Sequence, residues 1–93
     1  MPIFITFHML ELEHVAGKST FVKGRPVCIN VNNITYFITA ATKQHPENQG
    51  TFISFVGEDD NNGNVRVAES YNEVATLISS TVDYLRERYA NKP

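Results

Sequence analysis

The chain has 93 residues, 42% hydrophobic and 19% charged, which suits one small folded domain and excludes a chain that is disordered throughout. Its net charge of −2, with 8 basic against 10 acidic residues, disfavours a broad nucleic-acid-binding surface. No apolar run reaches the roughly 18 residues of a membrane-spanning helix, and the first residues lack the basic start of a signal peptide, so we expect a cytoplasmic protein that makes no membrane contact.

The N-terminal residues predict a strand followed by a long connection. Ile3, Ile5 and Phe7 are separated by single residues, and this period of two places them on one face of a strand. Residues 11–23 are mostly polar and include Gly17. We therefore expect a long loop there, or the wide end of a hairpin.

Four further strands are predicted downstream, because apolar residues alternate with others in four short segments. The strands are expected at residues 27–31, 34–39, 52–56 and 65–67. The connections between them are expected to be an Asn32-Asn33 turn, a loop over residues 40–50 and a hairpin tip over residues 58–63.

The last part of the chain predicts a helix. Ser70 is a good N-cap and Glu73 stands three residues later, which together form a capping box. Apolar residues then recur at the spacing of one helix face: Tyr71, Val74, Ala75, Ile78, Val82, Leu85 and Tyr89. We therefore expect a helix over residues 71–89.

These elements predict a single α+β domain over residues 1–93. A mainly antiparallel sheet of about five strands is expected within residues 2–69. The C-terminal amphipathic helix should pack on one face of this sheet, and residues 90–93 should form a frayed tail.

The predicted sheet has apolar side chains on both faces, whereas one helix covers only one face. Strand alternation places five such residues away from the helix: Phe4, Cys28, Phe37, Phe52 and Val56. The segment 9–21 could fold back over them, but it is mostly polar, so we favour self-association. The predicted interface residues are Phe4, Tyr36, Phe37, Phe52 and Val56.

Few residues suggest chemistry. Cys28 is the single cysteine, and its apolar neighbours predict buried packing rather than a nucleophile. Residues 58–69 match part of a calcium-loop pattern, but strands are predicted where that motif has helices, so an acidic hairpin tip is favoured. His8, His14 and His45 are too scattered to predict a metal site. We predict no catalytic residue, no cofactor and no metal.

From Arg25 onward the chain resembles the small flagellar proteins of the FlbD type. The resemblance is carried by Ile29-Asn30, Ile34, Thr51-Phe52-Ile53, Gly63 and the segment from Val67 to Val74, with the strand Ile3 to Phe7 also fitting. It covers roughly two thirds of the chain, and the segments 11–23 and 40–50 are longer than in that family. The family has no assigned catalytic residues, so the resemblance implies an accessory protein without enzymatic activity. A phage or mobile-element protein on the same scaffold fits equally.

The sequence therefore predicts a small non-catalytic interaction module that forms a homo-oligomer, with another protein as a further partner. A nucleic-acid-binding regulator is the first alternative, and it would use Lys18, Lys23 and Arg25 together with exposed aromatic rings. A small metal-binding protein is the second alternative, and it would use the histidines or the acidic tip.

Overall fold

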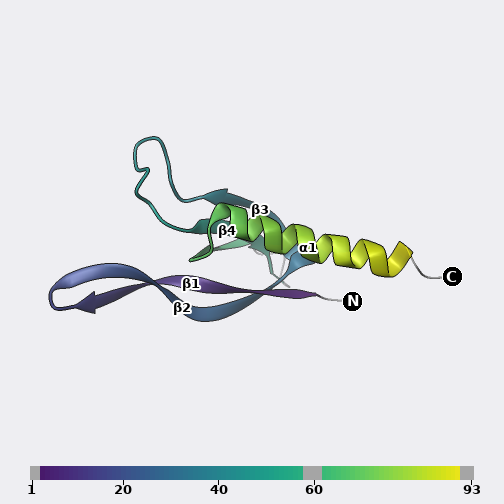
Figure 1. Cartoon of the computed structure of the whole chain (residues 1–93), viewed down its shortest axis with the longest axis horizontal. Coiled ribbons are helices and arrows are strands. Elements are labelled where there is room, and N and C mark those ends of the chain that lie inside the picture. Colours follow the sequence, from purple (N-terminus) through teal and green to yellow (C-terminus); the bar gives the residue numbers. More distant parts are fainter. Residues whose placement is uncertain (1–2, 58–61, 91–93) are drawn as a thin grey trace.

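The computed structural model describes residues 3–57 and 62–90. Its elements, in chain order, are β1 (Phe4–Val15), β2 (Lys18–Asn30), a 3₁₀ turn (Val31–Asn33), β3 (Ile34–Thr39), β4 (Thr51–Val56), β5 (Asn62–Val67) and α1 (Tyr71–Ala90). The described residues form a five-stranded antiparallel sheet with one C-terminal helix, which confirms the predicted α+β fold (Figure 1).

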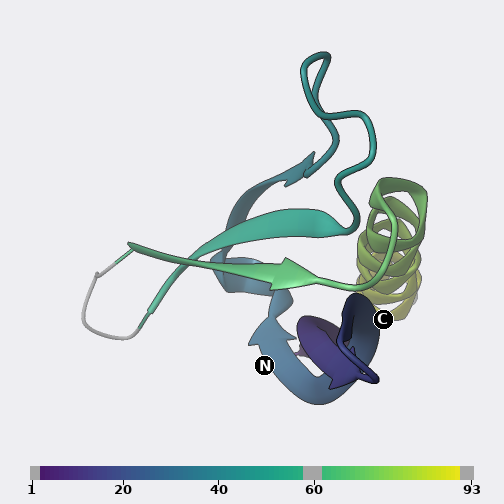
Figure 2. The same cartoon turned by 90° about the vertical axis from the view of Figure 1, so that its left-hand side faces the viewer.

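The sheet has the strand order β2-β1-β5-β4-β3 and is bent into two parts. Figure 2 shows the β1–β2 ribbon on one side, β3, β4 and β5 on the other, and α1 beside both. The two parts meet where Met9 of β1 pairs with Val67 of β5, next to a hydrogen bond of 2.7 Å from the Ala68 N–H to the His8 carbonyl oxygen. The register between β1 and β2 shifts between His8 and Leu10, so the ribbon changes direction at this junction.

The core lies where the two parts of the sheet and α1 come together. Its buried side chains come from four strands and the helix: Ile5, Phe7, Ile29, Ile53, Val67 and Val74. All six occupy positions that the periodicity of the sequence assigned to the inward faces of strands and helix. The alternation of apolar residues therefore located the core correctly.

Residues 11–23 are the largest departure from the predicted loop, because they form paired strands at the end of the β1–β2 hairpin. The alternative prediction of a hairpin end is therefore nearer to the structure. β1 and β2 continue outward to a two-residue turn, in which Ala16 has φ 52° and Gly17 has φ 79°. Two successive positive φ angles match the twist of antiparallel strands, which is why this turn closes a regular hairpin. The overlooked signal is the alternation of leucine and glutamate over residues 10–13. We call residues 11–24 the arm.

The arm makes the molecule elongated. The principal extents are 61 × 28 × 26 Å, and the radius of gyration is 15.6 Å, against about 12 Å for a compact chain of this length. Figure 1 shows the end of the β1–β2 hairpin projecting beyond the rest of the sheet. Most of the arm projects beyond the sheet, and it reaches the face away from the core at Phe21, whose ring lies against Arg66. The less favoured alternative, that residues 9–21 fold back as a cover over that face, is therefore wrong.

An irregularity in β3 changes which of its side chains face the core. Ile34 pairs with Phe55, and Tyr36 pairs with Ser54, so β3 has one residue more than β4 over this interval. The extra residue, Thr35, forms a β-bulge. A bulge reverses the alternation of the residues that follow it, because the strand advances by one residue without a partner.

Phe37 therefore faces the core together with Ile34. Its ring also contacts the ring of Tyr71 on α1, with centroids 5.1 Å apart. The predicted place of Phe37 on the far face is wrong. The exposed apolar side chains of β3 are Tyr36 and Ile38, at 57% and 52% of their full accessibility.

The helix begins as predicted, at the capping box. The Glu73 N–H donates to Ser70 Oγ at 3.2 Å, and the Ser70 N–H donates to Glu73 Oε1 at 3.3 Å. Val74 is fully buried and Ile78 packs against the core, whereas Leu77 is exposed. Within the described residues, α1 is not apolar enough along its length to cross a lipid bilayer.

Candidate functional site

A row of exposed side chains crosses the face of the sheet that points away from the core. Ile38 on β3 pairs with Phe52 on β4, and Phe52 pairs with Arg66 on β5. Directly paired residues of antiparallel strands have adjacent side chains, so the three form a continuous line. Phe21 on the arm extends this line, because its ring lies against Arg66. We call Ile38, Phe52, Arg66 and Phe21 the outer row.

Arg66 connects the two phenylalanines of the outer row. Its Cζ lies 5.0 Å from the ring centroid of Phe21 and 5.7 Å from that of Phe52, within the range of cation–π attraction. Its Nε donates a hydrogen bond of 2.9 Å to the Gln49 carbonyl oxygen, which limits its freedom to turn away. The rings and Ile38 remain exposed to solvent. The row is therefore an ordered apolar surface with one fixed positive charge.

The five predicted interface residues do not form one patch. Phe52 belongs to the outer row, and Tyr36 is exposed next to it on β3. Phe4 and Val56 line a separate apolar hollow of about 220 Å³. Phe37 lies against α1, as described above. The sequence missed Ile38, Phe21 and Arg66, because their neighbourhood depends on the bulge and on the position of the arm.

Cys28 is exposed and not buried as predicted. It lies on the outer side of the β1–β2 ribbon, where its Sγ is 3.4 Å from Thr6 Oγ1. The neighbouring Ile29 is buried instead, which follows from the alternation of side chains along β2.

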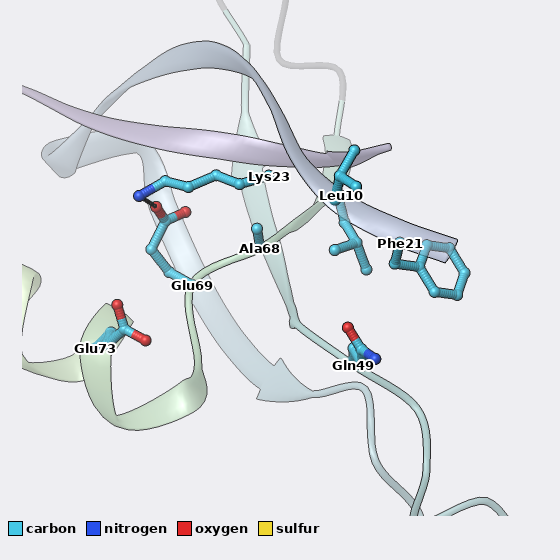
Figure 3. A pocket seen from close by; sticks show the side chains of 8 residues that line it. Leu10, Phe21, Lys23, Gln49, Ala68, Glu69 and Glu73 are labelled. Carbon is cyan, nitrogen blue, oxygen red and sulfur yellow. Dashed lines mark ion pairs between the residues drawn. The ribbon is translucent and has the colours of Figure 1, made fainter. Parts of the chain in front are cut away.

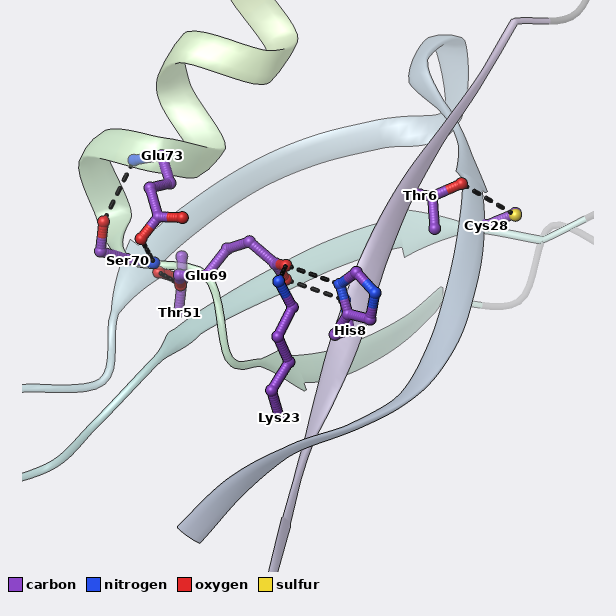
Figure 4. A network of polar contacts seen from close by, with 8 residues as sticks. All are labelled: Thr6, His8, Lys23, Cys28, Thr51, Glu69, Ser70 and Glu73. Atoms are coloured by element: carbon purple, nitrogen blue, oxygen red, sulfur yellow. Dashed lines mark hydrogen bonds and ion pairs between the residues drawn. The ribbon is translucent and has the colours of Figure 1, made fainter.

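A polar site, separate from the outer row, joins the base of the arm to the start of α1. The Glu69 carboxylate accepts the His8 N–H at 2.8 Å, lies 2.9 Å from His8 Nδ1 and is 3.8 Å from Lys23 Nζ (Figure 4). The Glu69 carbonyl oxygen also accepts the Thr51 hydroxyl at 2.9 Å. Glu69 is 7% exposed, so these contacts replace most of its hydration. The residue therefore links β1, β2 and β4 immediately before the helix cap.

The environment of Glu69 changes its acidity. Burial raises the pKa of the Glu69 carboxyl, but the hydrogen bonds from the His8 backbone and side chain outweigh that effect. The resulting pKa lies below the ordinary value of 4.5. The site therefore favours an ionised Glu69 in the folded protein.

A pocket of about 310 Å³ lies beside Glu69. Figure 3 shows Lys23, Phe21 and Leu10 on the side of the hairpin, and Gln49, Ala68, Glu69 and Glu73 around the remaining walls. The Lys23 ammonium is directed to the Glu69 carboxylate, and the Glu73 carboxylate caps the helix. The charged groups that line this pocket are therefore engaged in contacts that join elements of the fold.

The basic residues proposed for nucleic-acid contact lie along β2, and two of them face acidic partners. Arg25 Nε lies 2.8 Å from Glu11 Oε1, and Lys23 faces Glu69. The hydrogen bonds from Arg25 hold the pKa of the Glu11 carboxyl below its ordinary value. Lys18 stands at the end of the arm. These carboxylates offset two of the three positive charges, which weakens the attraction of this strand for phosphate.

The histidines do not converge. His8 contacts Glu69, His14 Nδ1 lies 2.6 Å from Ser19 Oγ, and His45 Nδ1 lies 3.2 Å from Glu47 Oε1. Within residues 3–57 and 62–90, no three metal-binding side chains come together. Part of the calcium-loop match, residues 58–61, lies outside the described residues; of the rest, residues 62–67 form strand β5.

Comparison of the chain with protein families, with curated proteins and with solved structures gives no match. The resemblance to the FlbD-type flagellar proteins stays a prediction. Any argument about function therefore depends on the surfaces and contacts described above.

Proposed function

We propose that this protein is a non-catalytic interaction module that associates with copies of itself. The observation that carries the proposal is the outer row, whose apolar side chains run from the arm to the edge strand β3. Single exposed apolar residues are common on monomers, whereas contiguous exposed apolar patches mark interaction surfaces.

The balance of buried and exposed side chains supports the same proposal. Among the described residues, seven hydrophobic residues are buried, whereas ten large hydrophobic residues are exposed. A domain of this size has a thin core, and assembly is a common way for such a domain to bury further apolar surface. Association would therefore bury apolar surface that a single chain leaves exposed. This burial would stabilise the folded chain and hold the oligomer together.

The test is the mass of the protein in solution over a wide range of concentrations. We expect the mass measured by sedimentation or light scattering to rise above that of one chain as concentration increases. Because apolar burial is the driving force, the association should persist at high salt. A single-chain mass at every concentration would refute the proposal.

A matched pair of variants tests which surface is used. Ile38 and Val15 are both β-branched and exposed, at 52% and 60%, but Val15 pairs with Lys18 beside the turn of the arm, outside the outer row. Ile38→Ser should weaken association, and Val15→Ser should leave it unchanged. Equal effects of the two substitutions would show that the contact is not centred on β3.

A further inference from the structure

The two edges of the sheet differ in how they are protected. β2 forms one edge, and it carries Lys18, Lys23, Arg25 and Pro26. Positive charges and proline are features that prevent an edge strand from pairing with another chain. The charged side chains and Pro26 therefore disfavour strand addition along residues 18–26 of the β2 edge.

β3 forms the other edge and has neither positive charge nor proline, and its bulge at Thr35 leaves residues 36–39 as the regularly paired part of the edge. Its sequence, Ile-Thr-Tyr-Phe-Ile-Thr, contains no charged residue, no proline and no glycine. β4 pairs with one side of β3, and within residues 3–57 and 62–90 no strand pairs with the other side. Such a strand presents unpaired backbone N–H and C=O groups, which are a template for another strand.

We propose, on the basis of the self-association described above, that two copies join by pairing their β3 strands antiparallel about a two-fold axis. A second β3 is the occupant that fits, because two uncharged strands place no like charges opposite each other. Pairing of β3 with the β2 of another copy would meet the lysines and Pro26, so the contact closes as a dimer and does not extend into a fibre.

The sequence of β3 also fixes a register. With Phe37 on the two-fold axis, Tyr36 of each copy lies opposite Ile38 of the other. Pairs of an aromatic with a β-branched residue are among the favourable cross-strand pairs. Tyr36 and Ile38 are both exposed on the far face, so this register matches side chains that lie on the same side of the sheet.

The size of the edge sets the strength of the dimer. Six residues extend about 20 Å, and a strip of this length buries less than the roughly 800 Å² per partner that is typical of tight complexes. The dimer is therefore expected to dissociate on dilution. Its sheet would be continuous across both copies, and the two outer rows would lie on the same face.

Hydrogen exchange of the β3 amides tests the strand pairing directly. Amides of β3 that point away from β4 should exchange quickly in dilute protein and become protected as concentration rises. If the mass rises but these amides remain unprotected, the edge contact is wrong and the self-association stands. If the mass never rises, the self-association itself is wrong.

Charge substitutions separate an edge contact from a face contact. Tyr36→Lys should raise the dimer dissociation constant about tenfold or more, because two lysines then lie near each other across the axis. Val15→Lys, beside the turn of the arm, is the control and should have little effect. A loss of association with Phe52→Lys but not with Tyr36→Lys would place the contact on the face of the sheet and overturn the edge pairing, while the self-association would stand. Circular dichroism identifies variants that fail to fold.

Disulfide crosslinking tests the register in a Cys28→Ser background. A mixture of Tyr36→Cys and Ile38→Cys chains should crosslink faster than either chain alone, because directly opposite positions lie within reach of a disulfide. Rapid crosslinking of Tyr36→Cys with itself would place the axis at Tyr36 and contradict the register.

Discussion

At the scale of single residues, Glu69 and Thr35 have effects that extend beyond their own positions. Glu69 connects β1 and β2 to the start of α1 through its contacts with His8 and Lys23. Thr35, as the extra residue of a bulge, decides that Phe37 faces the core and that Tyr36 faces solvent. A fold with a thin core depends on such residues, because few buried side chains stabilise it.

Glu69 should make stability depend on pH in the acidic range. Its pKa is lower in the folded protein than the ordinary 4.5, so its contribution is complete above about pH 4.5 and is lost as the pH falls through the folded pKa. Glu69→Gln should reduce the free energy of unfolding at neutral pH by on the order of 1 kcal/mol. The difference between wild type and variant should shrink below pH 4.5, as measured by urea unfolding. A constant difference across the acidic range would show that ionisation of Glu69 is not involved.

At the scale of elements, α1 is held by a narrow stripe of its surface. Val74 is fully buried and Ile78 packs against the core, whereas the adjacent Leu77 is 37% exposed. The capping box fixes the first turn, and the contact between Tyr71 and Phe37 attaches that turn to β3. The position of the helix therefore depends on its first two turns.

Two adjacent aspartate substitutions test this arrangement. Ile78→Asp should destabilise the fold by on the order of 3 kcal/mol or more, because it places an unpaired charge against the core. Leu77→Asp makes the same change on the exposed side and should cost much less. Thermal unfolding followed by circular dichroism measures both. Similar melting temperatures for the two variants would mean that the buried stripe of α1 has been assigned to the wrong residues.

At the scale of the whole molecule, the arm makes the shape elongated and contributes little to the core. Residues 12–21 are all exposed, and Glu11 pairs directly with Val22. A variant that replaces residues 12–21 with an Asn-Gly turn should therefore fold. We expect a smaller radius of gyration by X-ray scattering and a loss of about 1 kcal/mol, which reflects the missing contact between Phe21 and Arg66. Loss of cooperative unfolding would show that the arm is part of the folding unit.

The sequence by itself determined the features that depend on residues close together along the chain. Alternation located the inner parts of the five strands and, outside β3, their inward residues. The spacing of Ser70 and Glu73 located the start of the helix. Both signals follow from local backbone geometry. The fold class followed from these elements, and so did the expectation of exposed apolar residues.

Only the tertiary structure decided which exposed residues lie together. The bulge at Thr35 reversed the face of Phe37, the arm brought Phe21 to Arg66, and Glu69 met His8 across 61 positions of sequence. Strand register and long-range contacts set these neighbours, and one added residue in a strand exchanges its faces. The edge position of β3 likewise depends on the order of the strands in space, which local patterns do not encode.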